Sequence, residues 1–171
     1  MDQSEFLKIV LPFKDKVYRL AKRLLVSKDE AEDATQELYF KLWKNKSKIE
    51  GYDNVEAYAM MMTKNYCLDQ LKSKRASNLT LVHSNYQDES SSLQNEIENN
   101  DSATIIKRMI DDLPEKQKMI VQLRDIENYE YQEIGKIMNM EPTAIRVALS
   151  RARKTLRDNF IKKQNYGIVQ N

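Results

Sequence analysis

Apolar residues recur every three or four positions along most of this chain, which is the spacing of helices with one buried face. From residue 6 to residue 26 the spacing is interrupted near Pro12, so this segment predicts one or two amphipathic helices. The next segment, SKDEAEDATQELYFKLWKN, begins with Ser27 and has Glu30 three residues later, as in a capping box. Its small and apolar residues predict an inward stripe of Ala31, Ala34, Leu38 and Leu42.

The same spacing predicts further helices downstream. One should run from about Val55 to Ser73, after the loop IEGYDN. Beyond residue 104, Pro114 fits the first position of a helix, and Met119, Ile120, Leu123 and Ile126 should form the buried face of that helix.

A short helix over 131–138, a turn over 138–141 and a longer helix from Pro142 come next. In the short helix, Gly135 leaves room for another helix to approach closely. In the longer one, the inward side should contain Ile145, Leu149, Ala152 and Leu156. Together the two helices and the turn form a helix-turn-helix pattern.

Composition supports an all-α fold, because the chain has only three glycines and three prolines among its 171 residues. Charge then divides the chain. Residues 77–104 contain five acidic and no basic residues, whereas the blocks on either side are mildly basic. This polar, acidic segment predicts a flexible linker. We therefore expect two small helical domains, at 1–76 and 105–163, followed by a frayed tail at 164–171.

Several classes of chemistry are excluded by residue counts. Cys67 is the single cysteine and His83 the single histidine, so the chain cannot build an internal disulfide framework, a zinc site with two thiolates or a metal site with two histidines. The sequence has no glycine-rich phosphate loop and no run of eighteen apolar residues. We expect no metal, no cofactor, no catalytic residues and no membrane span, and we expect the protein to remain in the compartment where it is made.

The outward residues of the last helix are basic. They are Arg146, Arg151, Arg153, Lys154 and Arg157, with only Asp158 opposing them. A basic helix after a tight turn predicts binding to DNA, with Arg146 placed to make paired bonds to a guanine. A merely solvated charged face is the alternative, and spacing alone leaves a repressor, an activator or a polymerase subunit equally open.

Four segments in order resemble the extracytoplasmic-function (ECF) group of sigma factors, in the sigma-70 family. They are DEAEDATQELYFKLW, KNYCLDQLKSKR, LPEKQKMIVQLRDIENYEYQEIGKIM and IRVALSRARKTLR. The resemblance implies a cytoplasmic, non-catalytic subunit that binds core RNA polymerase and promoter DNA and directs transcription initiation. It implies no small-molecule substrate, and it implies an anti-sigma factor, often membrane-bound, as a further partner.

The resemblance also assigns site residues. A second stripe on the acidic helix, beside the inward one, corresponds to the polymerase contact and comprises Asp33, Gln36, Glu37 and Phe40. The first domain should recognise and open the minus-ten element through Tyr52, Asp53, Asn54, Lys64, Lys72, Lys74 and Arg75. The second should read the minus-thirty-five element through Thr143, Arg146, Val147, Ser150, Arg151, Arg153 and Lys154. Val147 and Ala148 stand where the family commonly has polar residues.

The main alternative is a free-standing helix-turn-helix regulator that binds operator DNA as a dimer. It would leave the acidic stripe and the KNYCLDQLKSKR helix without a purpose. A stable dimer with nanomolar affinity for duplex DNA in the absence of polymerase would favour it.

Overall fold

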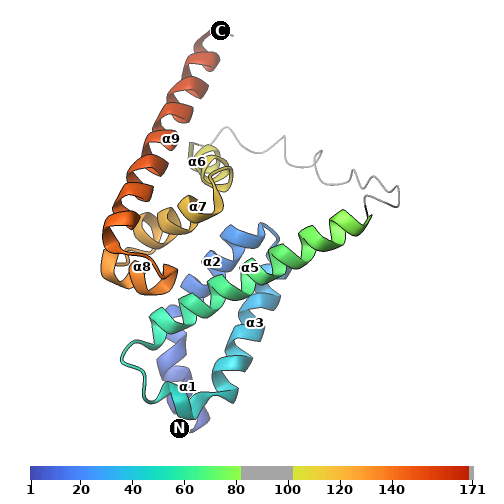
Figure 1. Ribbon diagram of the computed structural model, residues 1–171, viewed down its shortest axis with the longest axis vertical. Helices are drawn as coiled ribbons and strands as arrows, with labels where there is room; N and C mark the ends of the chain where they lie inside the picture. The colour runs from blue at the N-terminus through green and yellow to red at the C-terminus, as the bar shows by residue number, and fades with distance from the viewer. Residues whose placement is uncertain (82–101, 170–171) are drawn as a thin grey trace.

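The computed structural model describes residues 1–81 and 102–169, and every regular element in these two ranges is helical (Figure 1). The N-terminal part contains α1 (Gln3–Val10), the turn η1 (Leu11–Phe13), α2 (Lys14–Leu25), α3 (Lys28–Lys44), α4 (Lys46–Ile49) and α5 (Val55–Leu81). The C-terminal part contains α6 (Ser102–Asp111), α7 (Glu115–Val121), η2 (Gln122–Ile126), α8 (Tyr131–Met138) and α9 (Pro142–Val169). The predicted all-α fold is confirmed.

Local signals in the sequence account for several helix ends. Pro12 falls in the 3₁₀ turn η1, which separates α1 from α2. Val26 ends α2 in the left-handed conformation, with φ of 64°. The Ser27 hydroxyl then accepts a hydrogen bond of 3.3 Å from the Glu30 backbone N–H at the start of α3. This bond satisfies one of the N–H groups that have no partner within the first turn of a helix.

Two helices are longer than predicted. α5 does not end near Ser73 but continues to Leu81, and α9 continues to Val169, through most of the segment expected to be a frayed tail. The extension of α5, KRASNLTL, contains lysine, arginine, alanine and leucine, which favour helix without packing. No proline interrupts either extension. Of the predicted linker, residues 77–81 belong to α5 and residues 102–104 to α6, while the remainder lies outside the described residues.

The stretch after α7 also differs from the prediction. Pro114 lies just before α7 as its N-cap, and residues 122–126 form a π-helical turn in which the Glu127 N–H donates to the Gln122 carbonyl at 3.0 Å. A π-turn holds one extra residue, so it rotates the side chains that follow it relative to an α-helix. As a result Ile126, expected in the core, is 38% exposed, whereas Gln122 and Glu127 are buried.

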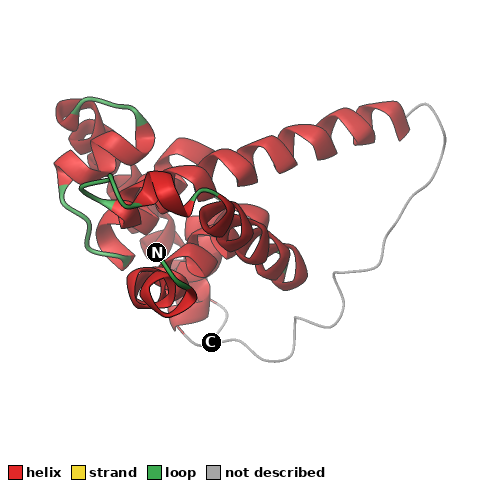
Figure 2. Ribbon diagram, turned by 90° about the horizontal axis from the view of Figure 1, so that it is seen from below, coloured by secondary structure: helices red, strands yellow, loops and turns green. Residues whose placement is uncertain are grey.

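The two parts pack against each other. α2 packs on α3 and α5 within the N-terminal part, and α9 packs on α6, α7 and α8 within the C-terminal part. α2 also contacts α7, and α8 lies along the first half of α5 (Figure 1). The buried apolar residues of both parts form one continuous cluster. The far end of α5 extends beyond this body (Figure 2). Among the described residues, no helix has the length and apolar character needed to cross a membrane.

Candidate functional site

The first candidate surface is the outer stripe of α3. Ala31, Ala34, Leu38 and Leu42 are buried as predicted and hold the helix on the core. On the neighbouring side, Asp33, Gln36 and Phe40 are exposed, and the Phe40 side chain is 61% exposed. Glu37 is partly exposed. Its carboxylate lies 3.4 Å from the ammonium of Lys41, which follows one turn later on the helix. Acidic groups beside an exposed aromatic ring suit a protein partner with a basic and apolar surface.

The second candidate surface is the loop before α5. Asp53 is exposed, and Tyr52 is 41% exposed with its ring 4.6 Å from that of Tyr58. The Asn54 side-chain oxygen accepts a 2.8 Å hydrogen bond from the Ala57 backbone N–H, so Asn54 caps α5. Capping uses the oxygen, which leaves the amide nitrogen as the donor that Asn54 could offer to a base.

The predicted basic contacts on α5 differ in their surroundings. Lys72 is exposed, whereas Lys64 is half-buried and its pKa is lowered by that burial. Lys74 pairs with Glu30 of α3, and Arg75 lies 3.2 Å from Glu115 of α7. Ion pairs that are this exposed contribute little, so phosphates could replace the carboxylates at modest cost.

The third candidate surface is the helix-turn-helix of α8 and α9. Asn139 ends α8 in the left-handed conformation, with φ of 53°. The Met140 N–H donates to the Gly135 carbonyl at 3.0 Å, which folds the turn back onto α8. A Cβ atom on Gly135 would lie only 2.8 Å from the Met140 carbonyl oxygen. Position 135 therefore requires glycine. The backbone that approaches it most closely belongs to the turn at Met140, whereas the sequence had predicted the approach of another helix.

The recognition side of α9 is largely exposed. Ile145, Leu149 and Ala152 are buried as predicted, and Leu156 is half-buried. The predicted minus-thirty-five residues all lie on the exposed sides of the helix, at Thr143, Arg146, Val147, Ser150, Arg151, Arg153 and Lys154.

Two of these arginines have partners inside the domain. The Arg146 guanidinium carbon lies 4.7 Å from the centre of the Tyr131 ring, and Arg124 approaches the same ring at 4.6 Å. Arg153 donates two hydrogen bonds, of 2.5 and 3.1 Å, to Asp125, and this bonding raises the pKa of Arg153. Arg153, which was predicted to contact DNA, is thus already paired with a carboxylate of its own domain.

Sequence reasoning missed a polar interface between the two parts. Arg19 of α2 donates two hydrogen bonds of 2.7 Å to the Glu127 carboxylate, whose side chain is 2% exposed. Arg23 donates to Asp111 at 2.8 Å and to Gln122 at 3.0 Å. The only signal in the sequence was the presence of two polar residues, Gln122 and Glu127, next to apolar positions expected in the core.

A second group of contacts joins the start of α5 to the C-terminal part. The Tyr129 hydroxyl donates to Glu56 at 2.6 Å, and Lys16 donates to the same Glu56 oxygen at 2.7 Å. Burial, reinforced by this hydrogen bond, raises the pKa of Tyr129, so the hydroxyl stays protonated and remains a donor. Glu56 lies two residues after the cap Asn54, so this contact adjoins the second candidate surface.

Comparison with known proteins identifies the family of this chain. The family models described as Sigma-70 region 2 and Sigma-70, region 4 match residues 9–77 and 103–156. The ECF RNA polymerase sigma factor SigW of Bacillus subtilis is 26% identical, over 91% of this chain and 89% of that protein. The ECF RNA polymerase sigma-E factor of Escherichia coli is 27% identical, over 94% of this chain and 88% of that protein.

Two solved structures share the fold. The sigma factor RpoE in complex with the anti-sigma factor NepR, from Bartonella quintana, aligns with a TM-score of 0.73 and 20% identity, over 90% of this chain and 95% of RpoE. CnrH in complex with the cytosolic domain of CnrY aligns with a TM-score of 0.67 and 15% identity, over 94% and 90% of the two chains. The protein belongs to the sigma-70 family and is an ECF sigma factor, a promoter-specificity subunit of RNA polymerase.

Proposed function

We propose that this sigma factor divides its work among the three surfaces. The outer stripe of α3 docks on core RNA polymerase, the loop before α5 and the basic residues of α5 bind the opened minus-ten element, and the start of α9 reads the minus-thirty-five element. One observation carries the proposal. On α3 and on α9 the buried face anchors the helix, which leaves most of the exposed stripe of each available to a partner.

Reconstitution with core RNA polymerase tests this division. Purified protein, core enzyme and a genomic promoter library should yield run-off transcripts that start at a defined set of promoters. Asp33→Lys and Glu37→Lys should weaken binding to core enzyme with helix content unchanged. Glu32→Lys is the matched control, because it reverses an exposed charge on the same helix outside the stripe. Unchanged affinity in both stripe variants would remove the assignment of α3.

The minus-ten assignment needs a separate measurement. The proposed contacts are Tyr52, Asp53, Asn54, Lys64, Lys72, Lys74 and Arg75. Substitution of Lys72 by alanine should lower the yield of open complexes and reduce the salt dependence of their formation, because a phosphate contact releases counterions. Permanganate footprinting of unpaired thymines measures the opening directly. An unaltered footprint for Lys72→Ala at every salt concentration would exclude it from the strand path.

We also propose that the protein is regulated by an anti-sigma factor, a class of partner that is often bound to a membrane. Of the two solved neighbours, RpoE was captured with the anti-sigma factor NepR and CnrH with the cytosolic domain of CnrY. In this protein, a cavity of about 570 Å³ between α2 and α6 is lined by Tyr18, Val26, Ile106 and Ile126, among others. Val26 and Ile106 are 57% and 43% exposed, so the cavity offers apolar surface to a helix of a partner.

We propose further that the protein acts in the cytoplasm and has no catalytic activity of its own, since bond formation belongs to the polymerase. Within 1–81 and 102–169, no three histidine, cysteine, aspartate or glutamate side chains are grouped to hold a metal ion. The protein therefore contributes positioning and promoter selection to initiation.

A further inference from the structure

The residue at the centre of the exposed face of α9 is apolar. Successive residues of an α-helix are rotated by about 100°, so Val147 lies about 200° around the helix from Ile145. Ile145 is fully buried, and Val147 is 46% exposed. Val147 is therefore almost opposite the side that anchors α9 on the domain, where the side chain penetrates furthest toward any groove that the helix enters.

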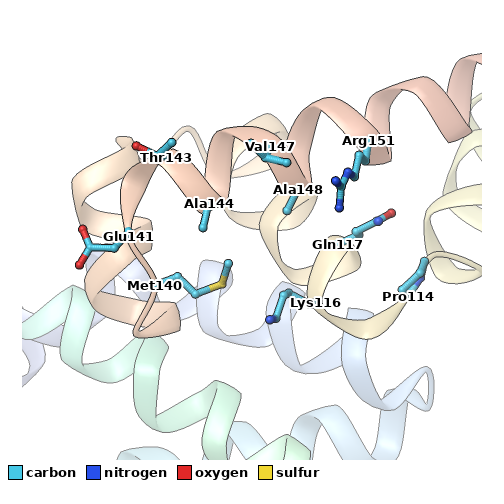
Figure 3. A pocket seen from close by; sticks show the side chains of 10 residues that line it. All are labelled: Pro114, Lys116, Gln117, Met140, Glu141, Thr143, Ala144, Val147, Ala148 and Arg151. Carbon is cyan, nitrogen blue, oxygen red and sulfur yellow. The ribbon is translucent and has the colours of Figure 1, made fainter.

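The surroundings of Val147 combine apolar and basic groups. It lines an open cavity of about 700 Å³ between the first turns of α9 and the start of α7 (Figure 3). Ala144 and Ala148 of the same helix and Met140 of the turn supply further apolar surface. Lys116 and Arg151 supply positive charge at its edge, against a single acidic residue of the lining, Glu141. Cations around an apolar centre fit a polyanion with one apolar group better than they fit an apolar protein segment.

Arg146 occupies a different side of the helix. It lies about 100° from Val147 and is stacked on Tyr131 of α8. A guanine contact by Arg146 would thus fall to one side of the base pair that faces Val147. A base edge directly beneath the middle of this face would therefore meet valine, with Thr143 one turn earlier on the same side.

Among the groups by which base pairs are distinguished in the major groove, the apolar one is the C5-methyl of thymine. We propose that Val147 is a specificity-determining residue that reads a thymine methyl in the minus-thirty-five element, with Ala144 and Ala148 closing the contact on its flank. This inference rests on the proposed role of α9. It adds to that role the chemical identity of the group that is recognised.

The test replaces thymine by uracil, which removes the methyl group and leaves base pairing intact. Promoters selected from the genomic library with the reconstituted holoenzyme first define the minus-thirty-five element. Each thymine of that element, on either strand, is then replaced singly by deoxyuridine, and holoenzyme affinity is measured by competition. One replacement should weaken binding about fourfold, the value for about 0.8 kcal/mol per buried methyl-sized group at 1.4 kcal/mol per tenfold.

Variants then assign the effect to Val147. In Val147→Ala the thymine-to-uracil ratio at that position should fall to near one, whereas Val147→Ile should retain it. Lys154→Ala is the control, because loss of a phosphate contact should weaken both DNAs alike and leave the ratio unchanged. Val147 is exposed, so circular dichroism should show the same thermal melting for all variants.

Three results would overturn the inference. They are an element without any A·T pair, equal binding of thymine and uracil DNA at every position, and an unchanged ratio in Val147→Ala. Run-off transcription separates these from failure of the proposed function, because a holoenzyme that initiates at defined promoters yet ignores the methyl contradicts only the inference. A protein that supports no specific initiation would contradict the proposed function itself.

Discussion

Arg19→Ala should open the protein by separating its two parts. Arg19 supplies two hydrogen bonds of 2.7 Å to Glu127, which is 108 residues away in the sequence. Without them the buried carboxylate would keep the 3.1 Å hydrogen bond that the Gln122 side-chain amide donates to it. When the parts separate, water replaces these donors, so the substitution penalises the closed arrangement and leaves the open one unaffected.

The size of the effect follows from the geometry. A hydrogen bond to a charged group contributes about 1.5–3 kcal/mol, and the exposure of Arg19, at 46% of its side chain, places the pair at the lower end. A loss of about 2 kcal/mol should shift the ratio of closed to open molecules by roughly 30-fold. Arg19→Lys should have an intermediate effect, because lysine retains the charge but not the paired donors.

Single-molecule energy transfer can measure this ratio. Ser47→Cys on α4 and Asn159→Cys on α9 place dyes at exposed positions in the two parts. The Arg19→Ala protein should show a larger population of low-transfer molecules than wild type, with helix content unchanged. Lys14→Ala, which removes an exposed cation from the same helix, should behave as wild type.

A double-mutant cycle provides the refutation. If the two side chains act as a pair, Glu127→Gln and Arg19→Ala together should open the protein much less than the sum of their separate effects. Fully additive effects would show that the bidentate contact does not hold the parts together. Identical energy-transfer distributions in wild type and Arg19→Ala would show that Arg19 does not hold the two parts together.

Three further predictions concern single positions. Gly135→Ala should lower the thermal melting temperature, because its Cβ would meet the Met140 carbonyl at 2.8 Å, and a melting curve equal to wild type would show that the turn can relax. Burial raises the pKa of Cys67 to about 12, so its thiol should resist iodoacetamide at pH 8 until denaturant unfolds the protein; rapid native alkylation would contradict the burial. Tyr131→Leu should relax the base preference conferred by Arg146, whereas Tyr131→Phe should retain it, because phenylalanine keeps the ring. Competition among single-base promoter variants measures the preference. Equal selectivity in all three proteins would show that the ring does not position Arg146.

The sequence was informative wherever structure depends on neighbours in the chain. The buried side of α3, the start of α9 after residue 141 and the left-handed end of α8 at Asn139 all follow from helical spacing and capping chemistry. The exposed stripes were predictable for the same reason, because fixing the inward residues of a helix also fixes the outward ones. These signals act within one or two helical turns.

Features formed between distant segments could not be predicted in this way. Arg19 and Glu127 have no common periodicity, and either could equally have been a solvated surface charge. The π-turn at 122–126 rotates the residues that follow it, so the apolar spacing misplaced Ile126. Gln122 at its start is buried and accepts a hydrogen bond from Arg23 of the other part. The contact of Arg146 with Tyr131 likewise depends on how α8 crosses α9. Helix propensity does not describe such contacts, because they form only after the helices have packed.

The length of α5 determines how the C-terminal part can move. This one helix contacts it near its start, through Glu56 and Tyr129, and again 19 residues later, through Arg75 and Glu115, a separation of about 28 Å at 1.5 Å per residue. Two contacts along one straight helix still allow the C-terminal part to rotate about the axis of that helix. The anchor from α2, at Arg19, lies on a different helix and removes this last rigid-body freedom. Because the exposed Arg75–Glu115 pair contributes little, the contacts of Arg19 and Glu56 mainly limit rotation of the C-terminal part, and we expect it to detach as a unit when both are lost.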